Sequence, residues 1–269
     1  MLPIHDVNPT RRTPVVTYLL IAVNVVAFLL SPVATHVLGG TGERDQCRQV
    51  AFFDHYAAEP KEVLTGTQQP QAATGEVGTD PAGGRTGCLV QQPPPFRKTP
   101  FVSVLTAMFL HGGWLHLLGN MLFLYVFGNN VEDRLGRLRY ALFYVFCGYV
   151  ATYGFSLFTP SSTSPLIGAS GAVAGVLGAY LVLYPRAKVW SLLTFLFFLP
   201  VRLPAWLVLG SWFVLQYLYF RGAGVAEGTG VAYGAHVVGF VVGALLVLRL
   251  RGSARPRSLQ ARYGPYARR

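Results

Sequence analysis

The sequence predicts an all-α membrane protein with six transmembrane helices. Hydrophobic residues make up 52% of the 269 residues and charged residues only 12%, whereas a soluble domain carries about 25% charged residues. The apolar residues are grouped in runs, several of which approach the roughly twenty residues that cross a bilayer. The six runs that we expect to span the membrane are 15–30, 101–127, 140–158, 166–184, 205–220 and 231–250.

The first run follows Arg11 and Arg12 and lacks a convincing Ala-x-Ala cleavage site, so we expect an uncleaved span rather than a signal peptide. A long polar loop, 32–98, comes next. Its second half is rich in Gly, Thr, Gln and Pro, and we expect little regular structure there. Cys47 and Cys88 both fall in this loop. They could form a disulfide if the loop faces an oxidising compartment, and the sequence leaves this open.

The apolar segment 189–199 is too short to cross a bilayer, and Pro200 and Pro204 behind it would break a helix. Counting it as a span would also place Lys188 and Arg202 on opposite sides of the membrane. We therefore expect an interfacial stretch here.

Basic residues predict the orientation of the six spans. They collect at span ends and in the C-terminal segment, which is typical of the cytoplasmic side. We expect a cytoplasmic tail over 1–14, a membrane domain over 15–250 with an external loop at 32–98, and a basic cytoplasmic tail over 251–269. The net charge of +11 is thus explained by orientation in a lipid bilayer, and we expect no nucleic acid as a partner.

Two polar residues, Ser170 and His236, stand out within the apolar runs. A histidine inside a membrane span is rare and points to a function. We expect Ser170 about four and His236 about five residues into their spans from the outer side, roughly 6 to 8 Å below the outer boundary. A serine and an imidazole at one depth indicate nucleophilic catalysis.

Small residues would let these two helices approach closely. Each carries a Gly-x-x-x-Gly pattern, Gly171 with Gly175 and Gly239 with Gly243. The alternative is that the glycines serve packing alone and that Ser170 bonds its own backbone. The histidine at matching depth favours catalysis.

A third polar cluster lies at the outer end of the second predicted span. His116 and Asn120 are four residues apart and share a helix face, and both can donate a hydrogen bond to a developing oxyanion. A structural role in bonding neighbouring loops stays open for this pair, as it does for His111. We expect no metal site, because His111 and His116 are spaced poorly for one helix face and His-Glu-x-x-His is absent from the sequence.

Acidic residues are scarce near these groups. After Asp133 the only acid in the sequence is Glu227, in an outer loop, so no carboxylate is placed to orient His236. The simplest chemistry is a Ser170–His236 dyad. The same scarcity argues against an intramembrane aspartyl protease and against a proton-coupled transporter.

Three motifs resemble the signatures of rhomboid intramembrane serine proteases: His116-x-x-x-Asn120, Gly168-Ala169-Ser170-Gly171, and Ala235-His236-x-x-Gly239-x-x-x-Gly243. They occur in the family's order on the second, fourth and sixth predicted spans. The segment from Glu132 to Gly136 is similar to a further family motif. The resemblance covers about residues 101–250.

The resemblance implies a six-helix rhomboid-like bundle that cleaves transmembrane segments of membrane proteins near the outer face. It makes Ser170 the nucleophile and His236 the general base, and it assigns His116, Asn120 and the Ser170 backbone N–H to the oxyanion hole, with Gly168 beside them. Many members carry an aromatic residue four positions after the serine, where this chain has Ala174. His236 must therefore be held in another way.

We expect a multi-pass protein of a bacterial plasma membrane, with both termini cytoplasmic, that acts as a serine endopeptidase without a cofactor. The alternative within the family is an inactive rhomboid-like protein that binds membrane helices. A transporter or channel is a third hypothesis, disfavoured by the lack of embedded charge.

Overall fold

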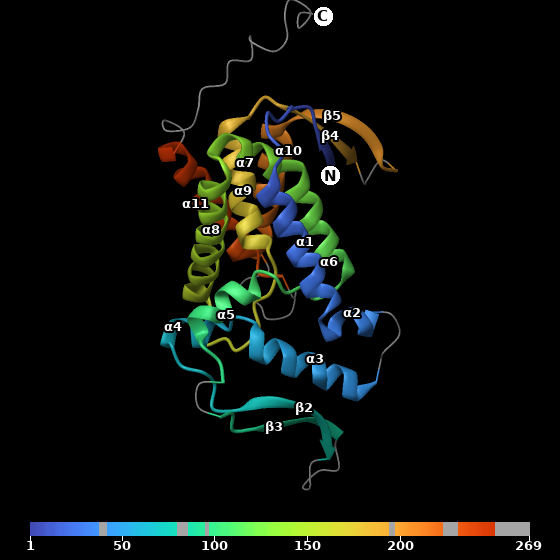
Figure 1. The fold of residues 1–269 in the computed structure, drawn as a ribbon, viewed down its shortest axis with the longest axis vertical. Helices are drawn as coiled ribbons and strands as arrows, with labels where there is room; N and C mark the ends of the chain where they lie inside the picture. Colours follow the sequence, from blue (N-terminus) through green and yellow to red (C-terminus); the bar gives the residue numbers. More distant parts are fainter. Residues whose placement is uncertain (38–41, 80–85, 95–96, 194–196, 223–230, 251–269) are drawn as a thin grey trace, which may run out of the picture.

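The computed structural model describes residues 1–37, 42–79, 86–94, 97–193, 197–222 and 231–250. A bundle of helices follows the long axis of the molecule, with short helices and a hairpin at one end and a small sheet at the other (Figure 1). The main helices are α1 (Val15–Leu29), α6 (Trp114–Phe123), α8 (Arg137–Phe158), α9 (Ser170–Leu183), α10 (Ala205–Gly222) and α11 (Tyr233–Leu250). The predicted tail 251–269 lies outside the described residues.

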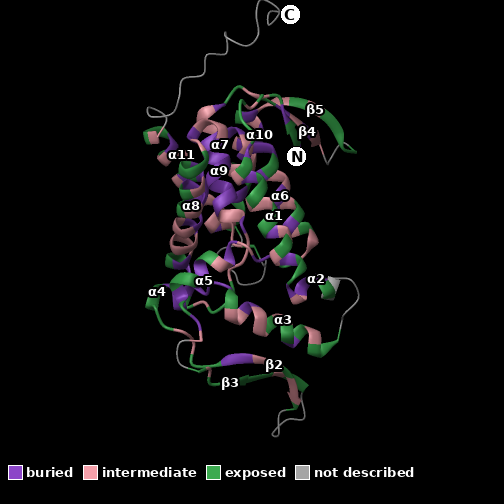
Figure 2. Ribbon diagram, in the orientation of Figure 1, coloured by how far each residue is buried: buried purple, intermediate pink, exposed green. Residues whose placement is uncertain are grey.

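The fold is mostly helical, as predicted. Among the described helices, α8 and α11 are long and apolar enough to cross a membrane, whereas α1 and α9 are apolar but shorter. Helix α9 occupies the centre of the bundle, and every residue from Ala172 to Tyr180 is buried (Figure 2). Small side chains on several faces of α9 let neighbouring helices pack around it.

The predicted start of the second span is wrong. Residues Pro100–Ala107 form a separate short helix, α5, and the next helix, α6, begins only at Trp114. Gly112 and Gly113 lie in the break, where two successive glycines raise the entropic cost of a continuous helix. Beyond α6 the chain continues through a π-helical turn, η1 (Leu124–Gly128), into α7 (Asn129–Leu135).

The all-α class is confirmed only in part, because the mostly helical structure also contains strands. The expectation of an irregular second half of the first loop is wrong. This loop contains α2 (Pro32–Val37), α3 (Glu43–Tyr56) and α4 (Pro60–Thr65), followed by an antiparallel hairpin of β2 (Ala72–Thr79) and β3 (Thr86–Gln91). We call α2 to α4 with this hairpin the cap. Cys47 of α3 and Cys88 of β3 form a disulfide that joins helix and hairpin.

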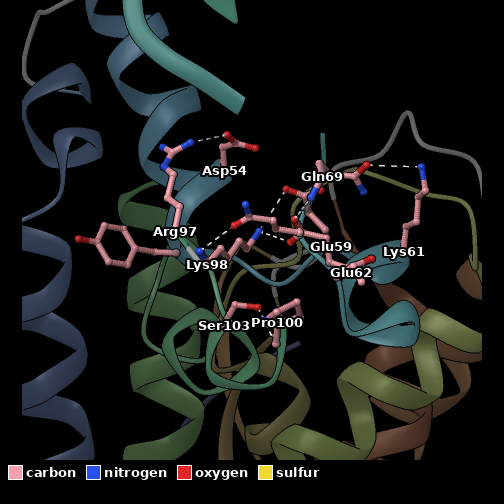
Figure 3. Close-up of polar contacts among 12 residues, drawn as sticks. Asp54, Glu59, Lys61, Glu62, Gln69, Arg97, Lys98, Pro100 and Ser103 are labelled. Atoms are coloured by element: carbon pink, nitrogen blue, oxygen red, sulfur yellow. Dashed lines mark hydrogen bonds and ion pairs between the residues drawn. The ribbon is translucent and has the colours of Figure 1, made fainter. Parts of the chain in front are cut away.

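A buried ionic cluster fastens the cap to the bundle (Figure 3). Lys98, which precedes α5, lies 3.2 Å from Glu59 and 2.5 Å from Glu62 at the start of α4. Glu62 also accepts a hydrogen bond from the backbone N–H of Gln69 at 2.7 Å. Burial raises the pKa of Glu59 to about 7, although Lys98 opposes the shift. Two carboxylates thus share one lysine.

The opposite end of the bundle carries a three-stranded sheet in the order β1 (Leu2–Asp6), β4 (Lys188–Leu193) and β5 (Leu199–Pro204). Strands β4 and β5 contain the two ends of the apolar segment 189–199, for which we expected an interfacial stretch, and β5 continues through Pro200 and Pro204. Pro200 and Pro204 lie on the edge strand, where a missing N–H is tolerated. Asp6, the last residue of β1, is buried, and its carboxylate accepts hydrogen bonds from Tyr180 Oη (2.6 Å) and Asn130 Nδ2 (2.8 Å).

Glu132 joins α7 to the beginning of α1. Its buried carboxylate accepts hydrogen bonds from the backbone N–H groups of Val16 (3.0 Å) and Thr17 (2.7 Å) and from Thr17 Oγ1 (2.8 Å). These N–H groups belong to the first turn of α1, where helices leave donors without an internal partner. Glu132 therefore completes the N-terminus of α1.

Candidate active site

Ser170 is the first residue of α9, whereas the sequence predicted it about a turn inside its span. The preceding residues are not helical: Leu166 pairs with Ala58 of the cap in an isolated bridge, and the Gly168 N–H donates to the carbonyl of Ala107 at 2.9 Å. The free N–H groups of the first turn of α9 therefore begin at Ser170, and a helix N-terminus favours developing negative charge.

Gly168 adopts a backbone conformation that side chains rarely tolerate, with φ of +116°. A Cβ added there would lie 2.8 Å from His116 Nε2 and 3.6 Å from Ser170 Oγ. Glycine at this position therefore allows the turn into α9 and leaves space between His116 and Ser170.

His236 lies in the first turn of α11, as predicted, and its Nε2 is 2.8 Å from Ser170 Oγ. The backbones of α9 and α11 touch at the glycines of both motifs. A Cβ added at Gly239 would collide with the carbonyl oxygen of Gly171, and one added at Gly243 with that of Gly175. The predicted close approach of these helices is confirmed. It brings the hydroxyl and the imidazole within hydrogen-bond distance.

Helix α10 supplies two contacts to His236 that the sequence analysis missed. Gln216 Oε1 lies 2.7 Å from His236 Nδ1, and the indole of Trp212 stacks on the imidazole with ring centroids 6.0 Å apart and an interplanar angle of 30°. Tyr233 approaches the ring edge-on at 6.2 Å. The available signal was Gln216 itself, because a polar amide in an apolar helix marks a functional position. These contacts hold His236 without an aromatic residue at Ala174.

His116 and Asn120 lie on α6 and face the same cavity as Ser170. The Gly112 N–H donates to His116 Nδ1 at 3.4 Å, which assigns the ring proton to Nε2, the nitrogen beside Gly168. Asn120 Nδ2 donates one hydrogen bond to the His116 carbonyl at 3.0 Å, and its second hydrogen remains for another acceptor. His111 is buried behind His116, with ring centroids 5.1 Å apart.

A cavity of about 830 Å³ connects these groups. Ser170 and His236 line it together with His116 and Asn120 of α6 and Gln216 of α10, and apolar side chains make up most of the remaining wall. A hydroxyl hydrogen-bonded to an imidazole, with N–H donors near it, can carry out acyl transfer to serine.

Comparison with known proteins agrees with this geometry. The profile of the rhomboid domain matches residues 98–253, more than half of the chain. Rhomboid protein 1, mitochondrial, of Saccharomyces cerevisiae is 32% identical over 172 residues, which cover 61% of this chain and 46% of that protein.

RHOMBOID-like protein 6, mitochondrial, of Arabidopsis thaliana is 36% identical over 107 residues, covering 37% of this chain and 34% of that protein. Rhomboid-like protein 11, chloroplastic, of the same plant is 33% identical over 153 residues, covering 53% and 50%. The chain thus spans between a third and a half of the length of these relatives. The match to the domain profile shows that the chain belongs to the rhomboid family.

Proposed function

We propose that this protein is an intramembrane serine endopeptidase that cleaves transmembrane segments of membrane proteins near the outer face of the membrane. The observation that carries the proposal is the 2.8 Å contact between Ser170 Oγ and His236 Nε2 at the wall of the cavity. Ser170 is the nucleophile and His236 the general base in this proposal.

The proposed reaction is acyl transfer through a covalent intermediate. Ser170 Oγ attacks a peptide carbonyl of the substrate while His236 Nε2 takes the hydroxyl proton, and the imidazolium then gives that proton to the leaving amine. Water, deprotonated by His236, then hydrolyses the ester, and the imidazolium returns the proton to Ser170 Oγ as the acid product leaves. The Ser170 N–H, His116 Nε2–H and the free Asn120 hydrogen stabilise the oxyanion, and one such donor is worth about 3 to 4 kcal/mol.

The proposed architecture is a six-span bundle over residues 15–250, flanked by cytoplasmic segments 1–14 and 251–269, in a bacterial plasma membrane. The distribution of charge supports this orientation. The terminal turns of α7, α8 and α11 that contain Arg134, Arg137 and Arg249 lie at the end of the bundle that carries β1, β4 and β5 (Figure 1). The disulfide lies in the cap at the opposite end, consistent with an oxidising exterior.

The proposal is tested by reconstituting the full chain in liposomes with a single-span reporter and following its cleavage. We expect Ser170→Ala and His236→Ala to abolish cleavage without loss of folding. Ser211→Ala, which removes a hydroxyl bonded only within α10, serves as the control and keeps the wild-type rate. Near-normal cleavage by either site variant would refute the dyad. A folded wild type that binds the reporter without cutting it would favour an inactive, helix-binding rhomboid-like protein.

A further inference from the structure

We propose that Gln216 is a positioning residue that holds His236 in the tautomer able to accept the Ser170 proton. The inference rests on the proposed function and extends it from a dyad to a chain of three side chains on three helices: Ser170 on α9, His236 on α11 and Gln216 on α10.

The hydrogen-bonding chemistry of the amide determines the position of the ring proton. In the amide orientation of this structure, Gln216 Oε1 faces His236 Nδ1 at 2.7 Å, and because an amide oxygen only accepts, this contact places the hydrogen on Nδ1. In the neutral ring Nε2 then has a free lone pair, and this atom faces Ser170 Oγ at 2.8 Å. The opposite tautomer would present an N–H to the hydroxyl and could not take its proton. Gln216 thus selects the tautomer that works as a base.

The surroundings of Gln216 restrict its movement and that of the imidazole. Gln216 is 8% exposed, although it borders the cavity. Trp212 lies one helical turn earlier on the same face of α10 and covers the face of the imidazole, while Tyr233 meets its edge. With these contacts, the two in-plane nitrogens of His236 point in two fixed directions, toward Ser170 and toward Gln216.

An amide suits this position better than a carboxylate. No Asp or Glu is found among the described residues that line the cavity, and an anion buried at membrane depth is costly unless it is paired. A neutral amide oxygen can still stabilise the imidazolium formed during the reaction, because a hydrogen bond to a charged partner is stronger than one between neutral groups. Gln216 therefore supplies the orienting acceptor without a permanent charge.

The test measures the tautomer directly. The protein is labelled with ¹⁵N-histidine, reconstituted in bilayers and studied by solid-state NMR, and the His236 signals are assigned by their loss in His236→Ala. We expect a protonated Nδ1 and an unprotonated Nε2 in the wild type. Gln216→Leu should shift the ring toward the Nε2–H tautomer, whereas Gln216→Glu, which keeps an oxygen acceptor, should retain the wild-type pattern. An Nε2–H tautomer in the wild type would overturn the inference, as would an unchanged pattern in Gln216→Leu.

Cleavage of the reporter supplies the second readout. We expect kcat of Gln216→Leu to fall roughly 10- to 100-fold with little change in KM, because the lost hydrogen bond strengthens as the imidazolium forms. Gln216→Glu should recover part of the loss, and Ser211→Ala on the same helix should match the wild type. An unchanged kcat in Gln216→Leu would contradict a positioning role. A wild type with the expected tautomer but without any cleavage would refute the proposed function and leave the positioning of His236 standing.

Discussion

Gly171, directly after the proposed nucleophile, offers a quantitative test of how closely the helices must pack. A Cβ added at Gly171 would lie 2.7 Å from the Cβ of Ala151 on α8, whereas ordinary contacts begin at 3.4 Å. Neither atom can rotate away, so Gly171→Ala must part α8 and α9 locally by about 0.7 Å. A shift of this size at Ser170 would stretch its 2.8 Å contact with His236 beyond hydrogen-bond length.

We expect Gly171→Ala to slow reporter cleavage roughly 10- to 100-fold, since a misplacement of about 1 Å costs about 100-fold. Ala151→Gly removes the opposing Cβ, so the double variant should recover most of the rate. The control is Gly210→Ala on α10, where an added Cβ would meet no atom within 4 Å. A wild-type rate in Gly171→Ala would refute the reasoning, and so would a double variant as slow as the single one.

Three further predictions concern the oxyanion donors, α1 and the cap. Asn120→Ala should lower kcat without abolishing it, because other donors remain; an unchanged kcat would remove Asn120 from the oxyanion hole. Glu132→Gln, which weakens the three hydrogen bonds that Glu132 accepts at α1, should lower the free energy of unfolding in detergent by roughly 2 to 3 kcal/mol, and an unchanged melting temperature would contradict this. The pKa of Glu59 is raised from 4.5 to about 7 in the folded protein. Between pH 4.5 and about 7 the folded protein therefore binds more protons than the unfolded chain, and the free energy of unfolding should fall as pH rises through this range. Glu59→Gln should reduce this dependence on pH when melting temperatures are measured at several pH values. An equal dependence on pH in the wild type and the variant would contradict the prediction.

Much of the candidate site was predictable, because each residue type that carries its chemistry stands out within a short stretch of sequence. The glycine-flanked Ser170 and His236 are visible as polar residues in apolar runs, and their contact follows from close packing of α9 and α11. Gln216 was not identified, because its role depends on the rotation of α10 relative to α11. Tertiary packing decides that rotation, and a single amide in an apolar helix does not reveal its partner.

The two errors in the fold have different physical origins. The second half of the first loop is rich in Gly, Thr and Gln, a composition typical of disordered chains. Its strands nevertheless pair as a hairpin, which the Cys47–Cys88 disulfide joins to α3. Hydropathy could not locate the break before Trp114, since the residues on both sides of it are apolar. In the loop, long-range contacts outweigh local composition, whereas at the break the local signal is the Gly112-Gly113 pair, which hydropathy does not register.

The central claim is that His236 activates Ser170, and labelling with a fluorophosphonate probe tests it most directly. The purified full chain is treated with the probe, and the adduct is located by mass spectrometry of its peptides. We predict one adduct on Ser170 in the wild type and none in His236→Ala, which keeps the hydroxyl but lacks the base. A folded wild type without an adduct would contradict the account, and so would an adduct that forms equally fast in His236→Ala.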